Sequence, residues 1–249
     1  DLLGNIWRFD VNDSIAPAGR EATLVGVATD SGGTPQPITT RPELAEVNAK
    51  PMVFVATGKL LGATDISDQQ PQTIYGIVDP LSGSPAYADL RTALVPLAMT
   101  QTGSGSTAVR TVACTGSAAV CSSTNNGWRV ELPDPGERVN VDMKLALGTL
   151  VVPSNVPQSS ACTTGGYSWL NYFSYTTGQA VSSSGSSTVS QYATPAGQAL
   201  TVGVTIVQLP DGTLRAILVT SDAAIRSLNI PYDPPQPTGK RISWREVTR

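Results

Sequence analysis

The sequence of 249 residues contains no histidine. This absence excludes the Ser-His-Asp triad, the HExxH zinc proteases and every histidine-ligated haem, copper or zinc site. A hydrolase built from this chain would need a Ser-Lys pair or paired carboxylates. None of the lysines, Lys50, Lys59, Lys144 and Lys240, has a serine three residues before it, so nucleophilic hydrolysis is poorly supported.

Charge is also scarce, at 14% of residues, against roughly 25% in an ordinary soluble domain. The net charge of −3 provides no general basic surface, so we expect no nucleic-acid partner. No stretch of about 18 apolar residues is present, so we expect no membrane span. No signal peptide is recognisable, and Asp1 leads directly into a strand-like run. We interpret the chain as part of a longer secreted protein.

The chain has three cysteines. Cys114 and Cys121 lie in a short loop of small and polar residues, which suits a disulfide that closes one hairpin; the alternative is two unpaired thiols. Cys162 remains, either free or paired with a cysteine outside this sequence.

What the chain does have is a recurring strand phrase, built around an aromatic residue and closed by a polar turn. It occurs at 4–13, 72–83 and 168–178, with a weaker copy at 213–222. Alternation with period two predicts strands, and internal repetition favours a stacked or radial β architecture. Further strands are predicted at 23–29, 52–57, 93–99, 127–132, 145–152, 199–209, 214–220 and 224–230. Helix is expected only as one or two turns within 85–97, ended by Pro96.

Several segments are predicted to lie outside this regular pattern. Residues 100–107 are low in complexity and predict a hairpin tip, while 181–190 predict a mobile loop. We interpret 100–126 and 155–166 as insertions between blades. A proline-rich connector at 231–237 leads into a predicted last strand at 241–247.

An ordered set of phrases carries a specific resemblance. They are DLLGNIWRFD, PITTRPELA, MVFVATGKLLGATDISD, QQPQTIYGIVD, GWRVELPDPGERVNVDMKLALGTLVVPSNVP, ACTTGGYSWLNYFSYTTGQAV and GKRISWREV. Together they resemble the C-terminal domain of the PilY/PilC family of type IV pilus biogenesis factors and tip-associated adhesins.

The resemblance implies an all-β fold with little helix, a modified β-propeller of the quinoprotein type. Residues 1–249 would then be the C-terminal part of the propeller domain and only a partial ring. It also implies a non-enzymatic role in pilus biogenesis, retraction control and surface adhesion. The implied partners are pilins or minor pilins, the N-terminal remainder of the parent protein, and a host or abiotic surface. The implied location is the cell surface, on the pilus, after export through the periplasm of a Gram-negative bacterium.

The resemblance further implies a calcium loop just before the segment that matches Asp1–Asp10. That loop is outside this sequence, so we expect calcium only in the upstream part of the parent protein. We assign no cofactor, metal ligand or catalytic residue to this segment. Two alternative functions stay open, a quinoprotein-type oxidoreductase and a secreted carbohydrate-binding propeller.

Three acidic clusters are candidate sites. Asp10, Asn12 and Asp13 resemble half of a calcium loop, but an Asx-type turn is the preferred interpretation. Asp65 and Asp68 are likewise interpreted as a polar turn. The third cluster is interpreted as an ion pair at a strand edge, rather than as acid–base catalysts, and comprises Glu137, Arg138 and Asp142.

The aromatic residues have two interpretations, core packing or an exposed adhesive patch. We favour core packing for the tryptophans, Trp7, Trp128, Trp169 and Trp244. Three tyrosines beside loops rich in glycine and serine are better candidates for adhesion, although packing is preferred for them too: Tyr167, Tyr172 and Tyr175.

Overall fold

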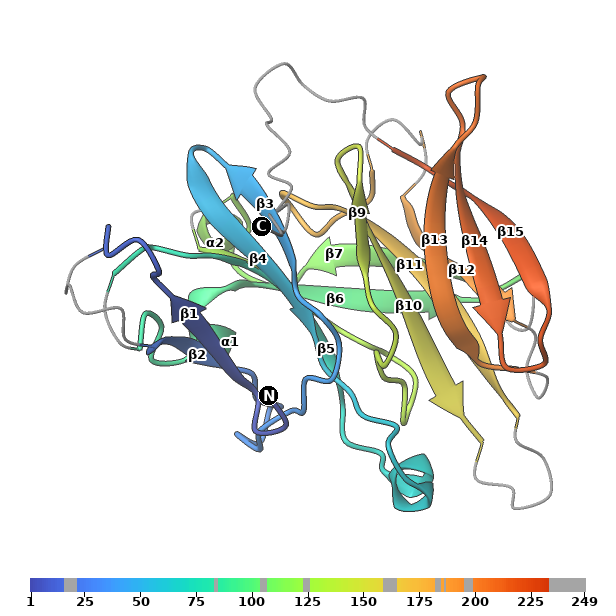
Figure 1. Ribbon diagram of the computed structural model, residues 1–249, viewed down its shortest axis with the longest axis horizontal. Coiled ribbons are helices and arrows are strands. Elements are labelled where there is room, and N and C mark those ends of the chain that lie inside the picture. The colour runs from blue at the N-terminus through green and yellow to red at the C-terminus, as the bar shows by residue number, and fades with distance from the viewer. Residues whose placement is uncertain are drawn as a thin grey trace, which may run out of the picture.

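The computed structural model describes residues 1–15, 22–82, 85–103, 107–122, 126–158, 165–181, 185, 187–194 and 199–232. Within these ranges the chain is all-β with little helix, as predicted (Figure 1). The strands form sheets of two, ten and three strands. The helical elements are one 3-10 turn, η1 (Ala63–Ser67), and two short helices, α1 (Leu90–Ala93) and α2 (Ala118–Ser122).

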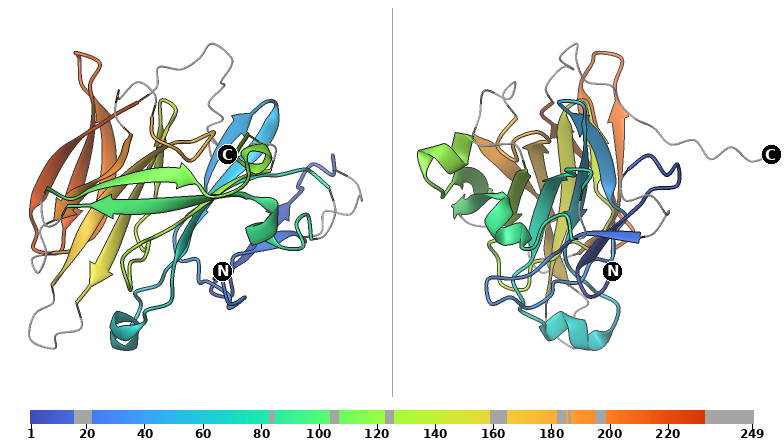
Figure 2. Two further views of the ribbon diagram at one scale, coloured as in Figure 1. Left: turned by 180° about the vertical axis from the view of Figure 1, so that it is seen from behind. Right: turned by 90° about the vertical axis from the view of Figure 1, so that its left-hand side faces the viewer.

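The ten-stranded sheet organises the fold. Its spatial order is β3 (Glu43–Val47), β4 (Lys50–Ala56), β5 (Thr73–Val78), β8 (Gly127–Glu131), β6 (Val95–Thr102), β7 (Val109–Cys114), β12 (Thr188–Thr194), β11 (Gly166–Ser174), β10 (Thr149–Pro157) and β9 (Lys144–Ala146). Only the β6–β8 pair is parallel. The two end strands, β3 and β9, contact each other, so the sheet is a nearly closed, barrel-like structure (Figure 2).

The main core lies inside this curved sheet. On β4 the even-numbered residues Met52, Phe54 and Ala56 belong to it, whereas Val53 and Val55 belong to a different cluster on the outer face. This alternation is the period-two pattern expected of strands buried on both faces. Trp128 on β8 lies in the interior beside Phe54 and Phe173, with ring centroids 6.2 and 5.9 Å away.

Two smaller sheets pack on the outside of the large one. The three-stranded sheet, β13 (Thr201–Gln208), β14 (Leu214–Thr220) and β15 (Ile225–Ile230), shares a core with the outer faces of β10, β11 and β12. The two-stranded ribbon of β1 (Asn5–Phe9) and β2 (Ala22–Val27) packs with α1 against β4 and β5. Figure 1 shows these two sheets at opposite ends of the molecule.

The recurring phrase forms strands in all four places, namely β1, β5, β11 and β14. The predicted Asp-Gly hairpin joins β13 to β14, with Leu209 N donating to Thr213 O and Gly212 at φ +87°. The predicted helix is confirmed as the single turn α1, and Pro96 lies in β6.

Three sequence interpretations need correction. Residues 100–126 are not a simple insertion, because β6 and β7 are central strands that pair from Leu97↔Cys114 to Thr102↔Val109. The second interpreted insertion, 155–166, overlaps the ends of two strands, because β10 and β11 stay paired as far as Pro157↔Gly166. Of the predicted mobile loop, Thr188–Ser190 belong to β12. The predicted strand at 241–247 lies outside the described residues.

Candidate functional site

A group of buried charges lies around Arg110, on β7. Its guanidinium donates to both carboxylate oxygens of Glu137, at 2.8 and 2.9 Å, and to Asp134 Oδ2 at 2.7 Å. Arg110 is 0% exposed and Glu137 is 1% exposed. A buried charge is costly unless it is paired, and this geometry pairs one cation with two carboxylates.

Small polar side chains extend this group across the neighbouring strands. Ser190 Oγ donates to Asn171 Oδ1, and Asn171 Nδ2 donates to Ser154 Oγ at 2.9 Å. Ser154 Oγ in turn donates to Glu137. The register explains their meeting, because Asn171 pairs with Ser190 across β11–β12 and Ser190 pairs with Arg110 across β12–β7. We call these five residues with Asp134 the Arg110 cluster.

Aromatic rings pack against the Arg110 cluster. The Arg110 guanidinium carbon lies 3.8 Å from the centroid of the Trp169 ring, a cation–π contact. Trp169 Nε1 and the Tyr167 hydroxyl each donate to Asp134 Oδ2 at 3.0 Å. Tyr192 packs on Trp169 with ring centroids 4.2 Å apart and stacks on Tyr167 at 5.7 Å.

The electrostatics of the cluster follow from its contacts. Burial raises the pKa of the Glu137 carboxyl, and the charge and hydrogen bonds of Arg110, with the Ser154 hydroxyl, oppose that rise. Among the described residues, every hydrogen-bond partner of the Glu137 carboxyl is a donor, including Asp134 N at 3.3 Å, which suits an ionised carboxylate. Burial, followed by the charge of Asp134, raises the pKa of Tyr167.

This arrangement is suited to holding a loop in place. Both carboxylates are bound by one guanidinium, so they do not share a proton as a catalytic carboxylate dyad does. Asp134 and Glu137 come from the loop between β8 and β9, which is thereby fastened to β7. The sequence interpretation of Glu137 as one member of a strand-edge ion pair is therefore wrong, since Glu137 is buried and its partner is Arg110.

Arg138 faces a different part of the molecule from its neighbour Glu137. Its guanidinium donates to four backbone carbonyls, those of Gly136, Lys59, Asp65 and Asp68. It thus fastens the same loop to the segment around η1. Asp142, the third residue of the predicted group, accepts from Arg41 N at 2.9 Å and does not join Glu137.

The other acidic candidates form turns. Asp10 Oδ2 accepts from Ile15 N at 2.6 Å, and Asp13 has φ 56°, which agrees with the turn interpretation. Asp65 Oδ2 accepts from the amides of Leu61 and Gly62, and Asp68 Oδ1 accepts from Gln70 N. Across the described ranges, no group of three or more His, Cys, Asp and Glu side chains is arranged to hold a metal ion.

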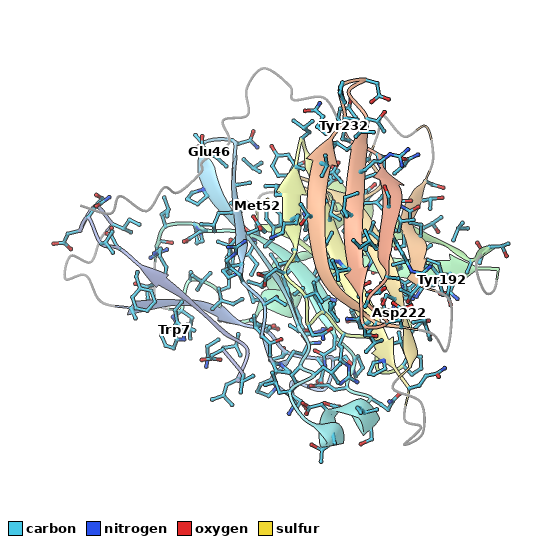
Figure 3. The ribbon with its side chains drawn as sticks, turned by 45° about the vertical axis from the view of Figure 1, so that its right-hand side comes forward. Trp7, Glu46, Met52, Tyr192, Asp222 and Tyr232 are labelled. Carbon is cyan, nitrogen blue, oxygen red and sulfur yellow. A yellow bond between two sulfur atoms is a disulfide. The ribbon has the colours of Figure 1, made fainter. Side chains whose placement is uncertain are left out.

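The tryptophans do not all behave alike. Trp128 and Trp169 are buried, as predicted. Trp7 is 45% exposed and lies on the side of the β1–β2 ribbon away from the large sheet, so its predicted core role is wrong (Figure 3). Trp244 lies outside the described residues. Of the tyrosines, Tyr175 packs on the main core, and its carbonyl accepts from Trp128 Nε1 at 2.9 Å.

An open groove of about 570 Å³ runs between β12 and β15. Tyr172 and Tyr192 line it together with Gln191, Arg226 and Leu228. Tyr172 is only 7% exposed. Within the described residues, its hydroxyl has no hydrogen-bond partner. The guanidinium Nε of Arg226 is also buried without a partner. The sequence pointed to Tyr172 but gave no sign of this groove.

The predicted cysteine pair is present as a disulfide between Cys114 and Cys121, with their Cα atoms 5.7 Å apart. It joins the end of β7 to α2. Cys162 lies outside the described residues. No helix in the described part of the chain is both long and apolar enough to cross a membrane.

The fold and the Arg110 cluster define an all-β, propeller-like domain whose buried charges hold its loops. No family model matches the chain. The chain is 26% identical, over 275 residues, to the type IV pilus biogenesis factor PilY1 homolog of Xylella fastidiosa (strain Temecula1), a match that covers 100% of this chain and 20% of that protein. The chain therefore spans about a fifth of the length of this curated relative.

A solved structure shares the fold. It is the crystal structure of the PilY1 C-terminal domain of Pseudomonas aeruginosa, with a TM-score of 0.61 and 18% sequence identity. The match covers 92% of this chain and 56% of that one. The resemblance to a PilY C-terminal domain, and the propeller-like fold that it implied, are thus confirmed.

Proposed function

We propose that this chain is the C-terminal part of the propeller domain of a longer type IV pilus factor that supports pilus biogenesis, counters retraction and contacts surfaces. The observation that carries the proposal is the similarity to a PilY1 homolog along the whole chain, joined to the fold of a PilY1 C-terminal domain. The proposed partners are pilins or minor pilins, the rest of the parent polypeptide, and a host or abiotic surface.

The proposed role is structural rather than catalytic. Two observations support it: the sequence has no histidine, and the buried charges of the Arg110 cluster are engaged in fastening the β8–β9 loop. The proposed location is the pilus at the cell surface. Calcium is proposed only for the upstream part of the parent protein.

Labelling of pili tests this proposal. An antibody raised against the 249-residue chain should label surface pili by immunogold electron microscopy and should detect the protein in sheared pilus fractions. A strain without the pilin gene is the control, and it should lose both signals. Absence of the protein from sheared pili of the wild type would contradict the proposal.

A second candidate function is glycan binding in adhesion, and the groove between β12 and β15 favours it. The groove combines two tyrosines with the side chain of Arg226, whose Nε has no hydrogen-bond partner among the described residues. Sugars commonly need such a mixture of aromatic faces and polar groups, which fix their orientation. This candidate deepens the adhesive role and is compatible with the structural one.

The variant Tyr172→Phe tests glycan binding, because it removes one hydroxyl and keeps the ring. We expect weaker retention of oligosaccharides on a glycan array, with unchanged thermal stability. Tyr87→Phe is a control, since that hydroxyl donates to Val78 O far from the groove. Retention that is absent for the wild type, or equal for both variants, would exclude the groove as a glycan site.

A further inference from the structure

The groove between β12 and β15 carries charge of one sign. Among the described residues that line it, Arg226 is the only charged one, and the others are tyrosines, small polar residues, one amide and aliphatic side chains. The walls that the structure describes therefore include no acidic side chain. A positive charge in a partly desolvated site attracts an anion more strongly than the same charge does in open water. The lining thus favours a ligand that carries negative charge.

The protein itself satisfies the Arg226 side chain poorly. Its Nε is buried without a hydrogen-bond partner, and its ion pair among the described residues is with Asp222, whose Oδ2 lies 3.9 Å from Nη2. The other oxygen of Asp222 accepts from the Thr220 hydroxyl and from Ala224 N. The two side chains of this long pair are 31% and 38% exposed, and pairs of that kind contribute little to stability. Arg226 therefore keeps hydrogen-bond donors for a ligand.

Arg110 shows what a satisfied guanidinium looks like in the same molecule. It donates to both oxygens of Glu137 and to one oxygen of Asp134. A guanidinium presents its donors in a planar fork, which fits the two oxygens of a carboxylate better than it fits a single hydroxyl. A carboxylate on a ligand would supply Arg226 with the kind of partner that Arg110 has in Glu137.

The remaining lining residues suit a sugar ring. The half-buried Tyr192 packs on Trp169 with ring centroids 4.2 Å apart, so its ring is held in place before a ligand arrives. Burial raises the pKa of Tyr172, so its hydroxyl stays protonated and can donate to a sugar oxygen. Gln191 Nε2 donates to Asn229 O at 2.7 Å, which joins the two walls of the groove. A site fixed in this way loses little conformational entropy on binding.

The size and shape of the groove allow a sugar within a longer chain to bind. Its volume of about 570 Å³ lies in the range of about 300–1,000 Å³ that is usual for small-molecule sites. Val109 and Leu228 add apolar surface beside the tyrosines, which suits the C–H face of a pyranose. Because the groove is open, the neighbouring sugars of the chain can extend into solvent.

We propose that this groove binds an acidic saccharide, and that Arg226 pairs with the carboxylate of a uronic or sialic acid residue in it. The Tyr192 ring lies against the apolar face of the sugar, and the Tyr172 hydroxyl donates to one of its oxygens. Arg226 is then the residue that distinguishes acidic from neutral sugars. This inference rests on the glycan-binding role proposed above for the groove and specifies the class of its ligand.

Titration calorimetry on the full-length polypeptide purified from cells tests the inference with two matched pairs of ligands. The first pair is a hyaluronan hexasaccharide, which contains glucuronate, and the same hexasaccharide with its carboxylates reduced to primary alcohols. The second pair is sialyllactose and lactose, so that the two sources of the carboxylate are told apart. At least one acidic ligand should bind about tenfold or more tightly than its neutral match, because a hydrogen bond to a charged group is lost with the carboxylate.

Two arginine variants assign the effect to the groove. Arg226→Gln should raise the Kd of the acidic ligand at least about tenfold, to the value for its neutral match. Arg41→Gln is the control, since it removes the same charge from a side chain that is 65% exposed and lies outside the groove, and it should leave the Kd unchanged. Thermal unfolding of both variants shows whether each is folded. If Arg226→Gln does not fold, the matched ligands decide the question on the wild-type protein alone.

The outcomes separate this inference from the proposals on which it rests. Equal binding of acidic and neutral ligands would overturn the role of Arg226 and leave the groove as a glycan site. Binding of none of the four ligands would overturn both the inference and the glycan role. Displacement of the acidic sugar by hexaglutamate at an equal concentration would make an acidic peptide the occupant, and the inference would be wrong. None of these results depends on pilus assembly, so the pilus proposal is tested separately.

Discussion

The indole of Trp128 occupies the space that a side chain on Gly76 would need. A Cβ added at Gly76 would come within 2.6 Å of Trp128 Cε2 and 2.8 Å of Met52 Cε. Gly178, at φ +69°, meets the same ring, since a Cβ there would lie 2.4 Å from Trp128 Cδ2. The glycine in the phrase QTIYGIVD and the glycine in SYTTGQ therefore make room for one buried tryptophan.

Gly76→Ala should destabilise the fold by about 1–3 kcal/mol, because it overpacks a closely packed core. Denaturant unfolding followed by tryptophan fluorescence measures the loss. Gly203→Ala, also in a strand, is the matched control, because its nearest neighbour, Val219 Cβ, would be 3.9 Å away. The control should be neutral or slightly stabilising, and equal losses in the two variants would contradict the packing account.

Glu137→Gln should cost about 3–5 kcal/mol, because it removes one charge from a buried pair and leaves Arg110 with less compensation. The same unfolding assay measures it. The control is Glu43→Gln, whose partner Arg41 is 3.7 Å away and mostly exposed. Since such surface pairs contribute about 0–1 kcal/mol, a Glu137→Gln effect no larger than the control would refute the role given to the Arg110 cluster.

Asp30 gives a pH prediction. The Gln70 side chain, together with the amides of Thr34 and Gly32, lowers the pKa of the Asp30 carboxyl. The resulting stability is therefore present above the unfolded pKa, about 3.9, and is lost as the pH falls through the folded pKa. Urea midpoints of wild type and Asp30→Asn should converge as the pH falls. A difference between the two urea midpoints that stays constant with pH would contradict this role of Asp30.

Replacing both Cys114 and Cys121 by serine should cost about 2–3 kcal/mol, from the entropy of closing a short loop in the unfolded chain. Thermal unfolding of the variant and of the wild type, the latter with and without reductant, checks this value. The reduced wild type should match the variant. A wild type whose Tm does not respond to reductant would argue against a stabilising disulfide at this position.

Local features of the fold could be predicted from the sequence because they depend on neighbouring residues. Alternation predicted strands wherever the aromatic phrase occurs, and Asp211-Gly212 predicted the β13–β14 hairpin. The short helix predicted within 85–97, of one or two turns, is the single turn α1, which ends before Pro96. The resemblance supplied the global fold, which strand patterns alone could not distinguish from a sandwich or a closed barrel.

The Arg110 cluster could not be predicted, because its members meet only through long-range pairing. Arg110 and Glu137 are 27 residues apart, and Arg110 lies in a segment that was interpreted as an insertion. A signal was nevertheless present: Ser154 and Asn171 lie in strands that are largely apolar, and a polar residue buried in such a strand needs a hydrogen-bond partner. The exposed position of Trp7 was missed for a different reason, since alternation does not say which face of a strand is covered.

The most direct test of the central claim is the number of surface pili after deletion of the gene that encodes this chain. Surface pilin, recovered by shearing and compared with total pilin, should fall sharply in the deletion strain and return when the wild-type gene is restored. If the protein counters retraction, removing the retraction motor as well should also restore surface pili. Normal surface pilin and normal adhesion in the deletion strain would contradict the account.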